Sequence, residues 1–157
     1  MSSVKLNKMI EKLQLVNLVP EVSTDEIEIS SPEINRPALQ LAGYFEHFAS
    51  ERVQIIGYVE YTYLKSLDRD VKMANYEQFL SSDIPCVIYS TRTEPDEDMI
   101  ELAKKYHKPL LSSHRITSDL MAEVIRWLGV ELAPCISIHG VLMDVYGEGI
   151  LIMGESG

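Results

Sequence analysis

The chain has 157 residues, 46% of them hydrophobic and 24% charged, which is typical of one globular domain with room for an added element. Its formal net charge of -10 argues against a nucleic-acid-binding protein, because few basic side chains are available to neutralise phosphates. No stretch approaches the roughly 18 apolar residues of a membrane span, and the N-terminal segment lacks the apolar core of a signal peptide, so we expect a cytoplasmic protein with no membrane partner.

The first half of the chain predicts helices and strands in alternation. Residues 3–15 carry apolar side chains at helical spacing, which predicts an amphipathic helix. Residues 26–29 alternate Glu and Ile, and residues 52–57 form an apolar run closed by glycine, so both segments predict strands. Residues 36–51 are interpreted as helical or irregular. A further helix is expected over residues 70–81, with Val71, Ala74, Phe79 and Leu80 as its apolar positions.

The next strand and helix have clear sequence signals. Residues 84–90 (IPCVIYS) form the kind of apolar, β-branched run that is typical of a buried parallel strand. Pro95 suits the first position of a helix, and the acidic residues 96–98 suit its positive end. Lys104 and Lys105 fall in the last turn of this helix, which we expect to end before Pro109.

A last strand and helix complete the alternating pattern. Residues 108–113 (KPLLSS) predict a strand, and Thr117 or Ser118 is expected to cap a helix that runs to about Leu132. The apolar positions of this helix are Leu120, Val124, Ile125 and Leu128. Strands that alternate with helices predict an α/β fold with a mainly parallel sheet and flanking helices over residues 1–132.

The pattern changes after Pro134. Two apolar segments, residues 136–146 and 149–153, are separated by a short turn that contains glycine, which predicts a β-hairpin. We therefore expect a domain boundary near residues 130–135, with residues 133–157 as the start of a second domain.

The two cysteines, Cys86 and Cys135, each follow a proline and open an apolar run. Free cysteine packs as a small hydrophobic residue at such positions, and the sequence has no Cys and His spacing typical of a metal site. We expect two buried, reduced thiols, with a disulfide as the less favoured alternative.

The end of the chain, GILIMGESG, places Gly154 directly after a predicted strand. A P-loop also begins with a glycine after a strand, and its backbone amides surround phosphate groups. A glycine after a strand is common, so this feature alone is a weak signal, and the Gly-Lys-Ser/Thr part of the motif would fall past Gly157.

The residues around this glycine make the signal specific. The segment HGVLMDVYGEGILIMGESG, residues 139–157, closely resembles the entry to the catalytic domain of the HPr kinase/phosphorylase family. The resemblance continues upstream in residues 36–57, in residues 84–90 and in the Leu-Ala-Pro stretch before the hairpin. It covers most of the chain, and the first 30 residues are the least distinctive.

The resemblance implies a function. Members of this family phosphorylate a serine of the phosphocarrier HPr with ATP or pyrophosphate, and remove that phosphate by attack of inorganic phosphate. The reaction needs magnesium and serves carbon catabolite control. The family's enzymes are hexamers whose active sites lie in the C-terminal kinase domain. Their N-terminal α/β domain resembles the first domain of the Mur ligases.

Few site residues transfer from the family to this sequence. His139 matches the family's active-site histidine, and Gly154, Glu155, Ser156 and Gly157 match the start of the P-loop. The loop lysine and hydroxyl, and the downstream aspartate that acts as base and acid, are not in these 157 residues. Because phosphoryl transfer depends on such groups, we expect the chain to be an N-terminal fragment without kinase activity of its own.

Other features have structural and functional interpretations. Glu94 and the acidic residues 96–98 are interpreted as a helix start, with a metal cluster as the alternative. His114 and Arg115 are interpreted as a solvated loop, with an anion site as the alternative. Tyr58, Tyr61, Tyr63 and Tyr76 are expected to pack in the core, with a partner-binding surface as the alternative.

The alternative to an enzyme fragment is a non-catalytic α/β module that binds a small molecule or braces an oligomer.

Overall fold

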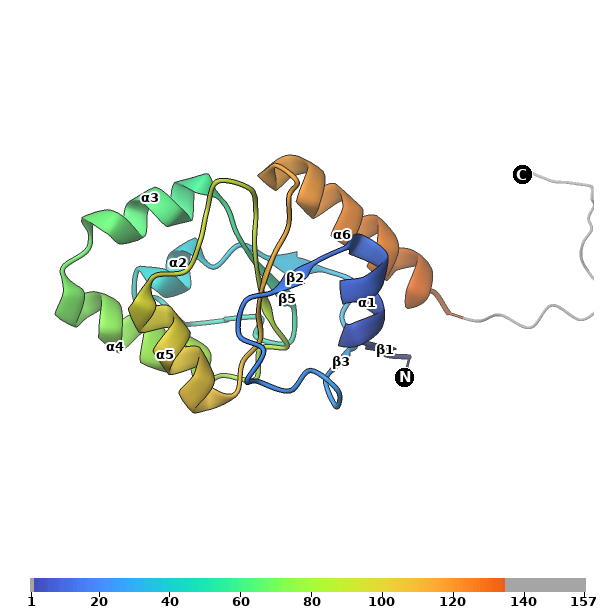
Figure 1. Cartoon of the computed structure of the whole chain (residues 1–157), viewed down its shortest axis with the longest axis horizontal. Coiled ribbons are helices and arrows are strands. Elements are labelled where there is room, and N and C mark those ends of the chain that lie inside the picture. Colours follow the sequence, from blue (N-terminus) through green and yellow to red (C-terminus); the bar gives the residue numbers. More distant parts are fainter. Residues whose placement is uncertain (1, 135–157) are drawn as a thin grey trace, which may run out of the picture.

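A computed structural model describes residues 2–134, which form an α/β fold with two sheets. The main sheet has the strand order β2-β7-β6-β5-β4, and a small antiparallel sheet pairs β1 with β3 (Figure 1). The strands of the main sheet are β2 (Val16–Asn17), β4 (Ile34–Asn35), β5 (Val53–Ile56), β6 (Val87–Tyr89) and β7 (Leu110–Ser112). The strands of the small sheet are β1 (Val4–Lys5) and β3 (Glu28–Ile29).

The main sheet is mostly parallel, as the sequence predicts. Strands β4, β5, β6 and β7 are parallel neighbours in chain order, and only the edge strand β2 is antiparallel, against β7. Each connection between consecutive parallel strands therefore places the next strand one position further along the sheet, always in the same direction. Because crossovers between parallel strands are right-handed, the helices that connect them come to the same face of the sheet.

Helices cover both faces of the main sheet (Figure 1). The crossover helices α2, α3, α4 and α5 pack on one face, while α1 and α6 pack on the other. The helices are α1 (Leu6–Leu13), α2 (Ala38–Leu41), α3 (Tyr58–Ser66), α4 (Arg69–Leu80), α5 (Glu97–Tyr106) and α6 (Thr117–Glu131). None of these helices is long and apolar enough to cross a membrane.

The alternation of side chains along each strand divides the core into two clusters. Val53 and Ile55 of β5, with Ile88 of β6, pack against α1 and α6. Ile56 and Tyr89, from the same two strands, pack against α2, α3, α4 and α5. The sheet is therefore buried on both faces, as parallel sheets require.

The structure shortens the first predicted helix. The sequence predicts a helix over residues 3–15, but α1 begins at Leu6, and Val4 and Lys5 form strand β1. Val4 pairs with Ile29 of β3, and this long-range pairing holds the backbone extended before the helix begins. The predicted strand over residues 26–29 is confirmed at β3, which is two residues long.

The sequence does not predict helix α3. Only Glu60 and Leu64 are buried on it, while Tyr58 and Val59 are 51% and 69% exposed, so its apolar residues do not follow one face. Tertiary packing, rather than periodicity, fixes this helix.

Two predicted helix starts are wrong in detail. Pro95 does not occupy the first helical position of α5; Asp96 is the N-cap, and its Oδ1 accepts a hydrogen bond from the Met99 amide at 2.8 Å. Neither Thr117 nor Ser118 caps α6, because Ile116 is the N-cap residue and provides no side-chain bond. Thr117 is the first helical residue rather than the cap, and its hydroxyl lies 2.8 Å from that of Ser90.

Three predicted core positions are also wrong. Val71 of α4 is 48% exposed, Ile125 of α6 is 44% exposed, and Ala74 of α4 is exposed too. In both helices other residues form the buried stripe: Tyr76, Phe79 and Leu80 in α4, and Leu120, Val124 and Leu128 in α6. The predicted hairpin over residues 136–146 and 149–153 and the thiol of Cys135 lie outside the described residues. The domain boundary near residues 130–135 stays a prediction.

A glycine allows three elements to meet where β5 ends. A Cβ at Gly57 would lie 2.8 Å from Arg36 Nη2 and 2.8 Å from both Cγ2 and Oγ1 of Thr117. These distances are shorter than van der Waals contact, so a side chain at residue 57 would displace the loop after β4 or the start of α6. Gly57 is thus required by close packing.

We predict that Val124→Ala lowers the free energy of unfolding by about 2 kcal/mol, because it removes buried methyl groups and leaves a cavity. Val130→Ala is the matched control in the same helix, since Val130 is 68% exposed while Val124 is fully buried. Urea unfolding of both variants measures the difference. Equal losses of stability would contradict the placement of the buried face of α6.

We predict that Gly57→Ala lowers the free energy of unfolding by about 1–3 kcal/mol through overpacking. Gly129→Ala should have the opposite effect, a gain of about 0.5–1 kcal/mol, because nothing lies within 4 Å of a Cβ at this helical glycine. Thermal unfolding of the two variants tests the contrast. A Gly57→Ala protein as stable as the parent would show that the three elements do not meet as described.

We predict that Cys86 does not react with a thiol reagent in the folded protein. The side chain is fully buried and free, and burial raises the pKa of its thiol to about 12. In a Cys135→Ser variant, a colorimetric thiol assay at pH 8 should therefore give no reaction until denaturant is added. Rapid labelling under native conditions would contradict the burial of β6.

Candidate functional site

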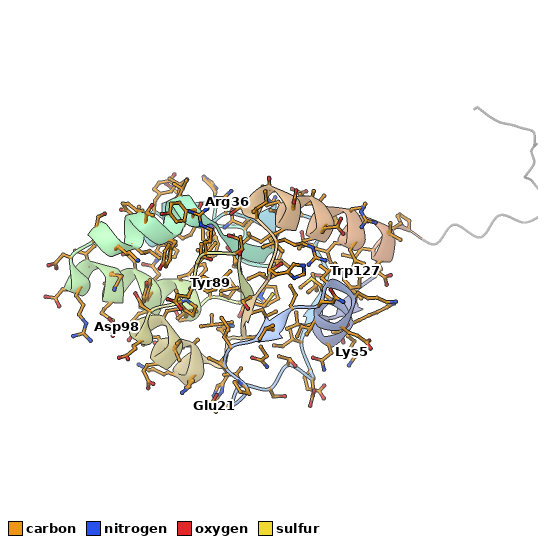
Figure 2. The ribbon with its side chains drawn as sticks, turned by 45° about the horizontal axis from the view of Figure 1, so that its top comes forward. Lys5, Glu21, Arg36, Tyr89, Asp98 and Trp127 are labelled. Atoms are coloured by element: carbon orange, nitrogen blue, oxygen red, sulfur yellow. The ribbon has the colours of Figure 1, made fainter. Side chains whose placement is uncertain are left out.

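The carboxyl ends of the four parallel strands lie along one edge of the main sheet, where α/β proteins commonly bind ligands. Arg36 follows β4, Gly57 follows β5, and Ser90 follows β6. The loop after β7 leads to the start of α6 at Thr117. In Figure 2, Arg36 lies between the starts of α3 and α6. This edge is the candidate functional site within residues 2–134.

An ion pair lies at the centre of this edge. Arg36 Nη2 donates to Glu60 Oε1 at 2.8 Å, and the Gly57 amide donates to the same oxygen at 2.7 Å. The Glu60 side chain is only 4% exposed, so its charge depends on the arginine for compensation. The Arg36 Nε is buried and has no partner among the described residues. The pair therefore joins the loop after β4 to the start of α3.

Hydroxyl and backbone contacts join the remaining loops. The hydroxyls of Ser90 and Thr117 lie 2.8 Å apart, and the Thr91 amide donates to the Arg115 carbonyl at 2.8 Å. The Thr93 hydroxyl donates to the Ser90 carbonyl at 2.7 Å. These bonds tie the loop after β6 to the loop after β7, so the edge is a connected scaffold.

The arrangement supports binding rather than catalysis. Its central charges neutralise each other, and its hydroxyls are engaged with one another or with carbonyls. Three exposed apolar side chains, Tyr58, Val59 and Ile116, lie beside the ion pair. Within residues 2–134, no group of three or more His, Cys, Asp or Glu side chains is placed to hold a metal ion.

The site residues predicted from the sequence lie elsewhere in the chain. His139, expected to act near the reacting phosphates, and Gly154, Glu155, Ser156 and Gly157, expected to begin a P-loop, are all outside the described residues. The structure therefore leaves their roles as predictions.

The acidic segment before α5 acts as the helix start that the sequence predicts. Asp96 caps the helix, and Glu97 and Asp98 lie in its first turn. Arg69 donates two hydrogen bonds to the Asp98 carboxylate, at 3.0 and 3.1 Å, and this pairing lowers the pKa of Asp98. These contacts support the helix-start interpretation for residues 96–98, whereas Glu94 lies before the helix.

The predicted loop of His114 and Arg115 has a structural role. Arg115 Nη1 donates to the Leu13 carbonyl at 2.7 Å, and so connects the loop after β7 to the end of α1. The His114 side chain is exposed. Arg115 is thus engaged with backbone, which favours the structural interpretation over an anion site.

The tyrosines do not form one cluster. Tyr76 is buried in the core, as predicted, but Tyr58 and Tyr63 are 51% and 37% exposed on α3. Tyr58 and Tyr61 have ring centroids 6.1 Å apart. The expectation of core packing is therefore right for Tyr76 and wrong for Tyr58 and Tyr63.

Arg36 and Glu60 are not among the site residues predicted from the sequence. One signal was available: Glu60 lies three residues after Gly57, the spacing at which a glutamate reaches back to the amide that precedes a helix. No signal in the sequence connects Arg36 to Glu60, because their contact depends on the pairing of β4 with β5.

One solved structure has a weak overall likeness to this chain. It contains the CBS and DRTGG domains of the regulatory region of Clostridium perfringens pyrophosphatase, complexed with the activator diadenosine tetraphosphate. The match covers 78% of this chain and 46% of that chain, with a TM-score of 0.46 and 16% sequence identity. A likeness of this size supports no statement on function.

Sequence relatives are much closer. The chain is 50% identical to the HPr kinase/phosphorylase of Lachnoclostridium phytofermentans over all 157 residues, which are 51% of that protein. It is 43% identical to the HPr kinase/phosphorylase of Alkaliphilus metalliredigens over all 157 residues, 50% of that protein. It is also 43% identical to that of Caldicellulosiruptor bescii over 152 residues, 97% of this chain and 49% of that protein.

The chain thus spans about half the length of the curated relatives that it matches. A family model described as the HPr serine kinase N terminus matches residues 4–128, which include every described helix and strand except the last three residues of α6. The match therefore covers nearly all of the described α/β fold, which carries the candidate site. The chain belongs to the HPr serine kinase N-terminal family.

Proposed function

We propose that this chain is the N-terminal part of an HPr kinase/phosphorylase. The enzyme would act in the cytoplasm, as a hexamer, on a serine of the phosphocarrier HPr and so serve carbon catabolite control. The observation that carries the proposal is the alignment of the whole chain, at 50% identity, with a protein named HPr kinase/phosphorylase. The family match over residues 4–128 supports it independently.

The proposed reaction is reversible phosphoryl transfer. In the kinase direction, the serine oxygen of HPr forms a bond to the terminal phosphorus of ATP or pyrophosphate. The bond to ADP or to phosphate then breaks, and the hydroxyl proton is released. In the phosphorylase direction, an oxygen of inorganic phosphate attacks the phosphoserine, which releases serine and forms pyrophosphate.

The proposed catalytic residues belong to the segment after the α/β domain. Backbone amides of Gly154, Glu155, Ser156 and Gly157 would bind phosphate, as in other P-loops, and His139 would lie near the reacting phosphates. Magnesium, when bound, would neutralise charge on the phosphates. Residues 2–134 offer it no cluster of ligands, so its ligands would come from other residues.

The alternative function is a non-catalytic α/β module that binds a small molecule or braces an oligomer. The closed ion pair of Arg36 and Glu60 favours it for residues 2–134, because neither group is left available for chemistry. The two functions are compatible, since the module would be one part of the larger enzyme.

We predict that a polypeptide of these 157 residues transfers no phosphate to HPr, whereas the polypeptide extended to the length of its relatives does so with ATP or pyrophosphate and magnesium. Mass spectrometry of HPr measures the product. In the extended polypeptide, His139→Ala should lower the rate about 10²-fold or more, because it removes a group beside the reacting phosphates.

His114→Ala is the matched control, since His114 is exposed on a loop of the α/β domain, and it should leave the rate unchanged. Phosphorylation of HPr by the 157-residue polypeptide would contradict the proposed division of roles. An extended polypeptide that leaves HPr unmodified would overturn the proposed function itself.

A further inference from the structure

A second feature of the carboxyl edge is a cavity of about 280 Å³ on the face covered by α3, α4 and α5. It lies between α3, α4, the end of β6 and the loop that leads to α5. The residues with polar groups on its wall are Tyr61, Lys65, Lys72, Tyr76, Tyr89 and Glu94, together with the N-cap Asp96. This volume is close to the lower limit of about 300 Å³ for ligand pockets, so the cavity suits one small molecule.

The inner wall of the cavity includes the side chain of Tyr89. Tyr89 is 1% exposed, and no described residue makes a hydrogen bond to its hydroxyl, which borders the cavity. Figure 2 shows Tyr89 in the interior, between the sheet and the helices of this face. Burial raises the pKa of Tyr89 above its usual range, so the group stays a neutral O–H donor. Within residues 2–134, Arg36 Nε is the only fully buried side-chain polar atom without a partner, so the Tyr89 hydroxyl keeps access to the cavity, where a ligand could accept its hydrogen bond.

Beside Tyr89, one carboxylate fixes two further groups. Asp96 Oδ2 accepts hydrogen bonds from Lys72 Nζ at 2.8 Å and from the Tyr76 hydroxyl at 2.9 Å. Its other oxygen accepts from the Met99 amide. The Lys72 side chain is 15% exposed and has three N–H donors, so it can donate to a ligand while it keeps its bond to Asp96.

The mouth of the cavity carries two opposite charges. Lys65 Nζ lies 4.3 Å from the centroid of the Tyr61 ring, and Glu94 stands on the loop opposite. Neither Lys65 nor Glu94 forms an ion pair with any residue in the range 2–134. Tyr61 is the main cause that raises the pKa of Lys65, and Glu94 contributes less. One ammonium and one carboxylate are therefore available at the same opening.

The charges limit the class of ligand. The two lysines and the two carboxylates of the wall sum to zero, so a ligand with a net charge would leave one charge uncompensated. Donors predominate at the inner wall, and a carboxylate acceptor stands at the mouth. A small molecule that carries both a carboxylate and an ammonium matches this arrangement.

We infer that the cavity binds a small zwitterion of the α-amino acid class, with its carboxylate toward Tyr89 and Lys72 and its ammonium toward Glu94. The ring of Tyr61 and the side chain of Leu64 would contact the apolar part of the ligand. This site is on the α/β domain, and the inference does not depend on the proposed phosphoryl transfer.

The test uses the 157-residue chain and the common L-α-amino acids, each added singly at millimolar concentration. Two-dimensional NMR should show saturable shifts of amides around Tyr89 and Glu94 for at least one amino acid. Its N-acetyl derivative, which lacks the ammonium, should bind about tenfold more weakly or worse, because a hydrogen bond to a charged group is lost.

Two variants assign the binding to the cavity. Tyr89→Phe removes only the hydroxyl, and Glu94→Gln removes only the charge, so each should weaken binding about tenfold or more while the protein stays folded. Tyr63→Phe is the matched control, since Tyr63 is exposed on α3 outside the cavity wall. Three results would overturn the inference. The first is no saturable shift with any amino acid, and the second is an affinity of both Tyr89→Phe and Glu94→Gln equal to that of the parent protein. The third is binding only of a polyol such as mannitol or of inorganic phosphate.

Discussion

The structure depends on the burial of strands β5 and β6 on both faces. Every residue from Val53 to Ile56 and from Val87 to Tyr89 is buried, so neither face of the central sheet can be left to solvent. One amide side chain, Gln54, lies within this region, and it is satisfied by Asn35 Nδ2 at 2.7 Å and by the Arg52 carbonyl at 2.8 Å. Because two layers of helices are required, α1 and α6 must cover the face that the crossover helices leave open.

The same constraint brings the functional groups together. The parallel strands end at one edge, so the residues that follow them meet there although they are far apart in the chain. The ion pair of Arg36 and Glu60 joins β4 to α3 at that edge, and Tyr89 ends β6 beneath the cavity a short way along it. The side chain of Tyr89 packs in the core beneath the crossover helices and also lines the cavity, where a ligand could reach it.

Much of the fold could be predicted from the sequence because the signals are local. The apolar runs around β5 and β6 predicted the strands of a parallel α/β fold. The charges at the two ends of α5 predicted approximately where that helix begins and ends. Helix α3 and strand β4 could not be predicted, since α3 has no apolar face and β4 is two residues long. The likeness to the first domain of the Mur ligases stays a prediction.

The candidate site was less accessible to sequence analysis. Glu60 had a local signal in its spacing from Gly57, but its pairing with Arg36 depends on sheet order. Tyr89 was interpreted only as part of a buried strand, because the sequence does not show that its hydroxyl lacks a partner. His139 and Gly154 rest on the family resemblance alone, since their roles depend on groups that the described residues do not include.

Native-state hydrogen exchange followed by NMR tests the central claim that buried strands β5 and β6 hold both helical layers in place. The account predicts that the amides of Ile55, Ile56 and Ile88 exchange most slowly, through the same global unfolding as the buried amides of α4 and α6. The loop at residues 91–94 should exchange faster, through local opening. Exchange of β5 or β6 by a local opening, while the helices remain protected, would contradict the account.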